Sequence, residues 1–514
     1  MAQVTSRTRN SITNSLFGIV AALISVMLNF GVRYVLIKTL GEEINGLHNL
    51  FQSITNVLLL MELGIGSAMI IHLYEPIQHE NHAMIAGILK FYQQVYRYIA
   101  VAFFLLSLLL SVFFLQDLVH SSIDLSRVRL YFLLFTLSFV LNYLTNYKRS
   151  ILFAEQKNRV SILFSSAAEI TFRSIQIVTL FVWQQYVLFL VLTILEKLVS
   201  NYLCNRYIDR HYPYLKNNRE RLSDAKRRSI FTTVKSLMLN NVASTVQQSA
   251  RSLLISMLLG NVSIVGYYGN YQLIMSVVEL IYSQFGGALT SSFGNLAIEK
   301  DTTRMQAAYK KSAFLLNWIA AIFCAGFLVC VQDFIQLIFG ASFLINWMSV
   351  WVLGISLMVY LVNIPIISIQ NAMGLHHLDA YYMLFQAVLA IGLGYFGGLT
   401  YGMTGIFVGM LIPMIVFTSI RKGIVVTQHA LKMPIKTYLS FIAYEWLKMI
   451  AVSIVALGTV HGLALPLSFG TLLIKAGIVL VIGVVVPVLL SFKQAEFRYA
   501  VSLVKTILKR KLTR

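Results

Sequence analysis

The chain has 514 residues, of which 58% are hydrophobic and 12% are charged. Soluble globular proteins contain roughly 45–50% apolar and about 25% charged residues, and the apolar segments of a membrane β-barrel are short and alternating. The composition therefore excludes a soluble enzyme, a disordered chain, a coiled coil and a membrane β-barrel. It predicts an all-α polytopic membrane protein.

A spanning helix needs about 20 mostly apolar residues. The first apolar run follows Arg7 and Arg9, is too long for a signal peptide and lacks a small-residue cleavage site, so we expect a retained span. In chain order, fourteen runs are predicted to cross the membrane: 12–37, 46–73, 95–115, 128–147, 160–183, 186–205, 231–259, 264–290, 312–336, 347–370, 381–398, 402–420, 442–460 and 467–491.

The net charge is +21, and the uneven distribution of Lys and Arg along the chain indicates how the chain crosses the membrane. With the N-terminus inside, 31 of the 41 Lys and Arg residues lie in cytoplasmic segments and 3 in outer loops. This asymmetry predicts that both termini are cytoplasmic, and it argues against nucleic acid as a partner. The outer loops are short, so no outer domain is available for catalysis.

The chain contains a weak internal repeat at an offset of 218–219. Leu40-Gly41 followed by Gly46-Leu47 matches Leu259-Gly260 followed by Gly266-Tyr267, and Ala154 matches Ala372. An even number of spans per repeat predicts two parallel six-helix lobes around a central cavity, an arrangement typical of transporters. The predicted parts are lobe 1–210, a basic cytoplasmic linker 211–230, lobe 231–420, and 421–514 with two extra helices and a basic tail.

Polar residues share one face of the first predicted span and of its repeat partner, the seventh. A polar face is costly against lipid, so both helices are predicted to face a wet interior, although hydrogen bonding between packed helices is the alternative. The first stripe comprises Ser11, Asn14, Ser15, Ser25, Asn29 and Arg33, and the second Asn240, Asn241, Ser244, Gln247, Gln248 and Arg251.

Two arginines, Arg33 and Arg251, correspond to each other at an offset of 218. Because a guanidinium donates two parallel hydrogen bonds, the pair suits a phosphate group in the cavity. The alternative is that both side chains are anchors at the outer membrane interface. The predicted cargo-binding residues are Arg33, Arg251, Asn29, Gln247, Gln248, Ser244, Asn240 and Asn270.

Other charged residues fall within predicted spans. Glu62 and Glu279 are each expected to bind a proton or a cation, and Lys475 is expected to face either the cavity or an acidic neighbour. A structural pair is predicted between Glu169 and Arg173, which are four residues apart. Glu445 and Lys448 are predicted to be interfacial.

No catalytic, metal-binding or cofactor-binding motif is apparent. The sequence has no Walker motif, no G-x-S-x-G and no H-E-x-x-H, and its three cysteines, Cys204, Cys324 and Cys330, lie in or beside apolar runs. We therefore expect a non-enzymatic protein without a cofactor, in which transport is driven by a gradient or the membrane potential.

Several stretches are similar to motifs of the polysaccharide repeat-unit (Wzx-type) flippases of the multidrug/oligosaccharidyl-lipid/polysaccharide exporter superfamily. They are 40–47 (LGEEINGL), 62–68 (ELGIGSA), 265–271 (VGYYGNY), 294–296 (GNL) and 154–157 (AEQK). The chain departs from the family at 249–252 (SARS), where many relatives have an acidic T-D-N-like stretch.

The resemblance implies that the chain moves undecaprenyl-pyrophosphate-linked oligosaccharide to the outer leaflet for capsule or exopolysaccharide assembly. Membrane lipids and other polysaccharide-assembly proteins are the implied partners. Two alternatives in the same superfamily are a multidrug or toxin exporter and a lipid II flippase. A membrane glycosyltransferase or polymerase is disfavoured, because such enzymes need a sizeable outer loop.

Overall fold

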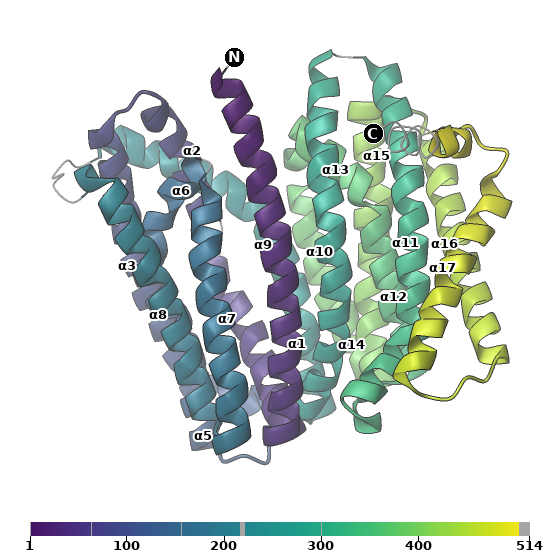
Figure 1. The fold of residues 1–514 in the computed structure, drawn as a ribbon, viewed down its shortest axis with the longest axis horizontal. Coiled ribbons are helices and arrows are strands. Elements are labelled where there is room, and N and C mark those ends of the chain that lie inside the picture. Colours follow the sequence, from purple (N-terminus) through teal and green to yellow (C-terminus); the bar gives the residue numbers. More distant parts are fainter. Residues whose placement is uncertain (1, 63, 156, 216–221, 300, 503–514) are drawn as a thin grey trace. The chain divides into compact units, whose positions relative to one another are not determined.

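The computed structural model describes residues 2–62, 64–155, 157–215, 222–299 and 301–502, which form helices joined by short turns, with no strand among them (Figure 1). The prediction of an all-α polytopic membrane protein is confirmed. Ten helical segments of this part are long and apolar enough to cross a membrane. The chain divides into two compact units, unit 1 (Met1–Gly266) and unit 2 (Tyr267–Arg514).

Unit 1 is a bundle in which α1 packs against α7, α7 against α8, and α8 against α5 (Figure 1). Its α-helices are α1 (Ala2–Leu58), α2 (Ile65–Gln78), α3 (His82–Leu109), α4 (Leu115–Leu118), α5 (Leu125–Asn146), α6 (Ser150–Ala154), α7 (Asn158–Trp183), α8 (Tyr186–His211) and α9 (Asp224–Leu259). Short 3₁₀ or π turns connect them at η1 (Leu59–Glu62), η2 (Leu110–Phe114), η3 (Tyr147–Arg149) and η4 (Pro213–Leu215).

The predicted count of fourteen spans is not confirmed, because several predicted spans merge or lack apolar character. Helix α1 includes the first predicted span and the beginning of the second, and it changes direction at Gly41, whose φ of 88° favours glycine. The segment Tyr381–Leu431 includes two predicted spans. By contrast, α7 and α9 carry several polar and charged residues and are not among the ten apolar segments.

The second predicted span is not one continuous helix. It is interrupted between Leu58 and Ile65 by the 3₁₀ turn η1 and by Gly64, which has a φ of 87°. Glu62 therefore lies in an interruption of the predicted span 46–73. Interrupted helices at membrane depth are tolerated where they border a cavity or are buried in protein.

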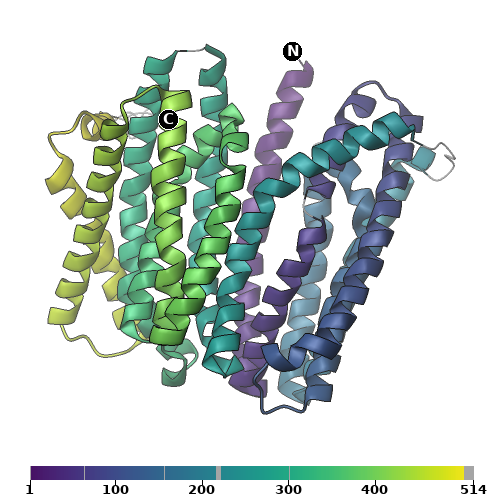
Figure 2. The ribbon, with the colours of Figure 1, turned by 180° about the vertical axis from the view of Figure 1, so that it is seen from behind.

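Helix α9 belongs to unit 1 by its contacts, although the predicted second lobe begins at residue 231. It contacts α1, α2, α4 and η1, and Figure 2 shows its first part lying obliquely across other helices of unit 1. His72 is 3.1 Å from the Thr233 hydroxyl, and Lys226 is 3.3 Å from the Glu75 carboxylate. The predicted lobe and linker boundaries remain a prediction, and linker residues 216–221 lie outside the described part.

The AEQK stretch attaches a loop to the end of α8. The Tyr212 hydroxyl donates to Glu155 at 2.5 Å, and Lys157 is 2.6 Å from the same carboxylate. Burial, together with the nearby Glu155, raises the pKa of Tyr212, so its hydroxyl remains a donor. The Lys148–Asp209 ion pair at 2.6 Å adds a second connection, so the beginning of the predicted linker is attached to unit 1.

Unit 2 is organised around α11, which packs against α12, α16 and α17. Its α-helices are α10 (Val262–Glu299, which begins in unit 1), α11 (Thr302–Ile338), α12 (Trp347–Val362), α13 (Ile364–Met373), α14 (Ala380–Pro413), α15 (Lys422–Val426), α16 (Ile435–Gly462) and α17 (Phe469–Ser491). Two short 3₁₀ turns are η5 (Ala341–Phe343) and η6 (Leu375–Leu378), and two π-helical segments are η7 (Met414–Arg421) and η8 (Thr427–Leu431).

The two C-terminal helices carry buried polar contacts. Lys448 is 2.8 Å from Glu445, and both side chains are at most 1% exposed, so the pair is buried within unit 2, and its place at the membrane interface stays a prediction. The two residues share a helix face that packs against α11, which keeps both charges out of contact with solvent. On α17, Lys475 pairs with Asp333, and the Trp318 indole donates to the Gly483 carbonyl at 2.7 Å.

Two pairs of glycines in unit 1 are matched by the repeat, and one of these pairs, Gly46 and Gly266, lies at a close backbone contact. Gly41 and Gly260 both have positive φ, of 88° and 61°. A Cβ added at Gly46 would overlap the Val262 carbonyl, and one added at Gly266 would lie 2.8 Å from the Asn45 amide nitrogen. The beginning of α10 thus packs directly on the second part of α1, which explains why glycine occupies both positions.

We predict that Gly46→Ala destabilises the protein by about 1–3 kcal/mol, because the added methyl group must displace backbone atoms. Thermal unfolding of the purified full chain in detergent would measure this as a lower midpoint. Gly31→Ala on the same helix is the control, since its Cβ would meet the Ile177 side chain at an ordinary 3.7 Å. Equal midpoints for the two variants would contradict the proposed contact.

Candidate functional site

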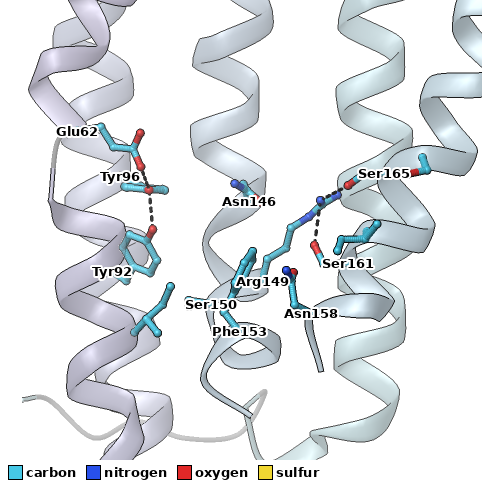
Figure 3. A pocket seen from close by; sticks show the side chains of 13 residues that line it. Glu62, Tyr92, Tyr96, Asn146, Arg149, Ser150, Phe153, Asn158, Ser161 and Ser165 are labelled. Atoms are coloured by element: carbon cyan, nitrogen blue, oxygen red, sulfur yellow. Dashed lines mark hydrogen bonds between the residues drawn. The ribbon is translucent and has the colours of Figure 1, made fainter. Parts of the chain in front are cut away.

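Unit 1 contains a cavity of about 390 Å³ beside the interruption between α1 and α2. Its walls come from η1, α2, α3, the end of α5, η3, α6 and the beginning of α7 (Figure 3). Most of the lining side chains are polar. The lining residues are Glu62, Ile70, Tyr92, Tyr96, Asn146, Arg149, Ser150, Phe153, Asn158, Ser161, Ile162, Ser165 and Ser166.

One wall is a carboxylate bonded by tyrosines. The Tyr96 hydroxyl donates to Glu62, Tyr92 donates to Tyr96 at 2.5 Å, and Tyr143 donates to Glu62 at 3.4 Å. Tyr92 and Tyr96 are four residues apart on α3, so both lie on the face toward the cavity (Figure 3). These hydroxyl donors give the carboxylate oxygens hydrogen-bond partners within the protein.

The opposite wall is built around the guanidinium of Arg149. It donates to Ser165 at 2.6 Å, to Ser161 at 3.3 Å and to Ser200 at 2.7 Å, and Figure 3 shows Ser161 and Ser165 beside it. Its Nε is buried and has no hydrogen-bond acceptor among the described residues. Hydroxyls carry no net charge, so these contacts leave the positive charge of Arg149 unneutralised.

Two amide oxygens between the walls lack donors. Asn146 Oδ1 and Asn158 Oδ1 are buried and accept no hydrogen bond from the described part of the chain. Buried polar atoms without a partner cost free energy, so their presence indicates a ligand or bound solvent. Amide acceptors, serine hydroxyls and an arginine suit a hydroxyl-rich molecule that carries an anionic group.

The polar stripe of α1 is partly used in packing against α7. Ser25 donates to Glu169 at 2.6 Å, and Asn29 donates to Ser25 at 3.3 Å. The predicted Glu169–Arg173 pair is therefore wrong. Glu169 accepts a hydrogen bond from Ser25, and Arg173 lies 3.8 Å from Glu196 on α8. These contacts match the helix-packing alternative for this part of the stripe. Arg33 is half-buried on the same helix.

The second polar stripe lies on α9. Gln247 and Arg251 are half-buried and Gln248 is exposed, whereas the side chains of Asn240 and Ser244 lie outside the described part. Because α1 and α9 are in contact within unit 1, the two predicted stripes belong to neighbouring helices. Whether their arginines bind cargo remains a prediction.

The other predicted residues are in unit 2. Asn270 is fully buried in α10, and neither polar atom of its amide has a hydrogen-bond partner among the described residues. Glu279 is half-buried on the same helix. For Lys475, of the two environments expected, the structure has the acidic neighbour, because the side chain pairs with Asp333.

The role of Arg149 was not evident from the sequence. The residue follows the predicted span that ends at 147, so it was expected to be one of the basic residues of a cytoplasmic loop. In the structure, a continuous helical segment runs to Ala154 and carries Arg149 into the cavity. The spacing of Ser161 and Ser165 by four residues on α7 is the signal that could have revealed a partner face.

Comparisons with known proteins found the fold in solved structures. Neither family models nor curated protein sequences match the chain. A structure of the lipid II flippase MurJ, in an inward closed conformation, has a TM-score of 0.66 and 18% identity; the match covers 97% of this chain and 100% of that one.

Structures of MATE transporters match over a smaller part of this chain. An inward-facing MATE-family transporter of the MOP superfamily has a TM-score of 0.65 and 12% identity, with 84% of this chain and 98% of that one covered. The Vibrio cholerae MATE transporter VcmN has a TM-score of 0.57 and 15% identity, with 85% and 100% covered. The chain therefore has the fold of these solved structures, which include a MATE-family transporter of the MOP superfamily and the lipid II flippase MurJ.

Proposed function

We propose that the chain is a flippase that moves undecaprenyl-pyrophosphate-linked oligosaccharide repeat units from the inner to the outer leaflet of a bacterial cell membrane. It would act in capsule or exopolysaccharide assembly, by alternating access and without enzymatic chemistry. The observation that carries the proposal is the cavity of unit 1. Its guanidinium, hydroxyl and amide groups fit a phosphorylated sugar head, while the polyprenyl tail remains in lipid.

The charge of the cavity favours this cargo over a lipophilic cation. A multidrug exporter is expected to offer a carboxylate to its cationic substrate. Here Glu62 is occupied by tyrosine hydroxyls, whereas Arg149 has three neutral partners and a buried donor without an acceptor. An arginine in this state attracts an anion, and its planar fork suits phosphate oxygens.

A lipid II flippase is the second candidate. The matched MurJ structure extends over 97% of this chain, compared with 84% and 85% for the two MATE exporters. The extra length supports a lipid-linked cargo. The sequence motifs at 40–47, 62–68 and 265–271 favour the polysaccharide branch.

We predict that Arg149→Ala reduces export at least tenfold, because a hydrogen-bonded charged group contributes about 1.5–3 kcal/mol to binding. The measurement is complementation of a strain that lacks this chain, with lipid-linked oligosaccharide on the cytoplasmic face quantified. Arg149→Lys keeps the charge but loses the planar fork, so partial export is expected.

Arg206→Ala is the matched control for Arg149→Ala, since Arg206 is exposed on α8 and contacts Tyr202 at 3.4 Å. It should retain export. Each variant must be present in the membrane at wild-type abundance. Wild-type export by Arg149→Ala would remove the cavity from the proposal, and a strain without accumulated lipid-linked oligosaccharide would refute the cargo class.

Arg33 and Arg251 are proposed to contact the cargo anion elsewhere on its path. We predict that the double variant Arg33→Ala, Arg251→Ala loses polysaccharide export while its insertion and abundance are unchanged. Export would be measured in the same complementation assay. If the double variant exports normally, both residues are interfacial anchors and the anion role is wrong.

Glu62 is proposed to bind the coupling proton, because it is a carboxylate at membrane depth beside the proposed cargo cavity. We predict that Glu62→Gln makes flipping in proteoliposomes insensitive to an imposed pH gradient, whereas the wild type responds. Tyr143→Phe removes the long 3.4 Å bond to the same carboxylate and should preserve the response. An unchanged response in Glu62→Gln would exclude this residue from coupling.

A further inference from the structure

Unit 2 contains a second cavity, of about 410 Å³, at the end of the unit that sequence analysis places on the cytoplasmic side. It is formed by the last turns of α10, the first turns of α11 and Tyr499, which follows α17. The lining residues are Leu289, Ser292, Phe293, Leu296, Arg304, Ala307, Ala308, Lys311, Ser312, Leu315 and Tyr499.

Within the described part of the chain, Lys311 is the cation on the polar rim of this cavity that has no acidic partner. Arg304 is 3.2 Å from Glu299 and 3.3 Å from Asp301, so its charge is already balanced. The Lys311 ammonium lies 4.6 Å from the centre of the Tyr499 ring, and among the described residues it forms no ion pair. The next residue, Ser312, adds a hydroxyl to the rim.

The remaining wall is apolar. Phe293 is 1% exposed, and the three lining leucines, Leu289, Leu296 and Leu315, continue the same surface. Lys311 falls at the predicted boundary between the cytoplasmic segment 294–311 and the span 312–336, where tyrosine side chains such as Tyr499 are favoured. A cation at the membrane boundary beside an apolar wall matches both the phosphate head and the acyl chain of a phospholipid. A free anion would contact the polar rim alone.

We propose that this cavity binds the phosphate head of an anionic phospholipid of the cytoplasmic leaflet, with Lys311 at the phosphate and the apolar wall against an acyl chain. Basic pockets between membrane helices on the cytoplasmic side are known to take anionic head groups. The site is independent of the cargo and of the unit 1 cavity. It adds a lipid ligand that the proposed transport cycle does not require.

The test is native mass spectrometry of the purified full chain, titrated separately with dioleoyl-phosphatidylglycerol and dioleoyl-phosphatidylcholine. The wild type should bind phosphatidylglycerol at least fivefold more tightly. Lys311→Gln should abolish most of that preference, and Lys311→Arg should retain it. Lys90→Gln is the matched control, because Lys90 is another exposed lysine on the predicted cytoplasmic side and lies outside this cavity.

Three results would overturn the proposal. The first is a wild-type chain without preference for phosphatidylglycerol, which needs no variant to be measured. The second is an equal loss of preference in Lys311→Gln and Lys90→Gln, which would indicate general attraction to a basic protein. The third is displacement of phosphatidylglycerol by millimolar inorganic phosphate or glycerol phosphate, which would identify a free anion as the ligand.

Discussion

The structure depends on one constraint: inside a bilayer no water is available, so each polar group must find a partner within the protein or border a polar cavity. Unit 2 meets this constraint with closed pairs, such as Glu445 with Lys448 and Lys475 with Asp333. Unit 1 meets it incompletely, because hydroxyls surround Arg149 without neutralising it. A buried positive charge without an anionic partner is costly in free energy unless a ligand supplies that partner. For this reason the cavity of unit 1 is the better candidate for function.

The sequence was sufficient to predict the features that depend on composition and short-range spacing. The helical membrane fold follows from long apolar runs, and the repeat at 218–219 pairs two glycines that both have a positive φ, Gly41 and Gly260. It also singled out Glu62 as a carboxylate of interest. Spacing could not reveal that η1 interrupts the helix at this residue, because the interruption depends on Gly64 and on the tyrosines that α3 supplies.

The remaining features depend on contacts between distant parts of the chain. Glu169 is four residues from Arg173, yet it accepts from Ser25, which is 144 positions away. Local spacing therefore suggested the wrong partner. Arg149 was missed for a related reason: its meaning depends on where a helix ends, and α6 extends the helical segment beyond the apolar run. When hydropathy alone places the end of the span at 147, Arg149 is interpreted as a charged loop residue although it lines a cavity.

The two cavities are similar in volume, about 390 and 410 Å³, but their walls differ in a way that separates their proposed ligands. In unit 1 both walls present hydrogen-bonding groups, and an acyl chain there would leave the Asn146 and Asn158 oxygens unpaired at a cost in free energy. In unit 2 the ammonium of Lys311, which forms no ion pair among the described residues, borders a wall of leucines, and a sugar head would lose its water against that wall without gaining hydrogen bonds. The desolvation of each wall thus selects a hydrophilic head in unit 1 and an amphipathic lipid in unit 2.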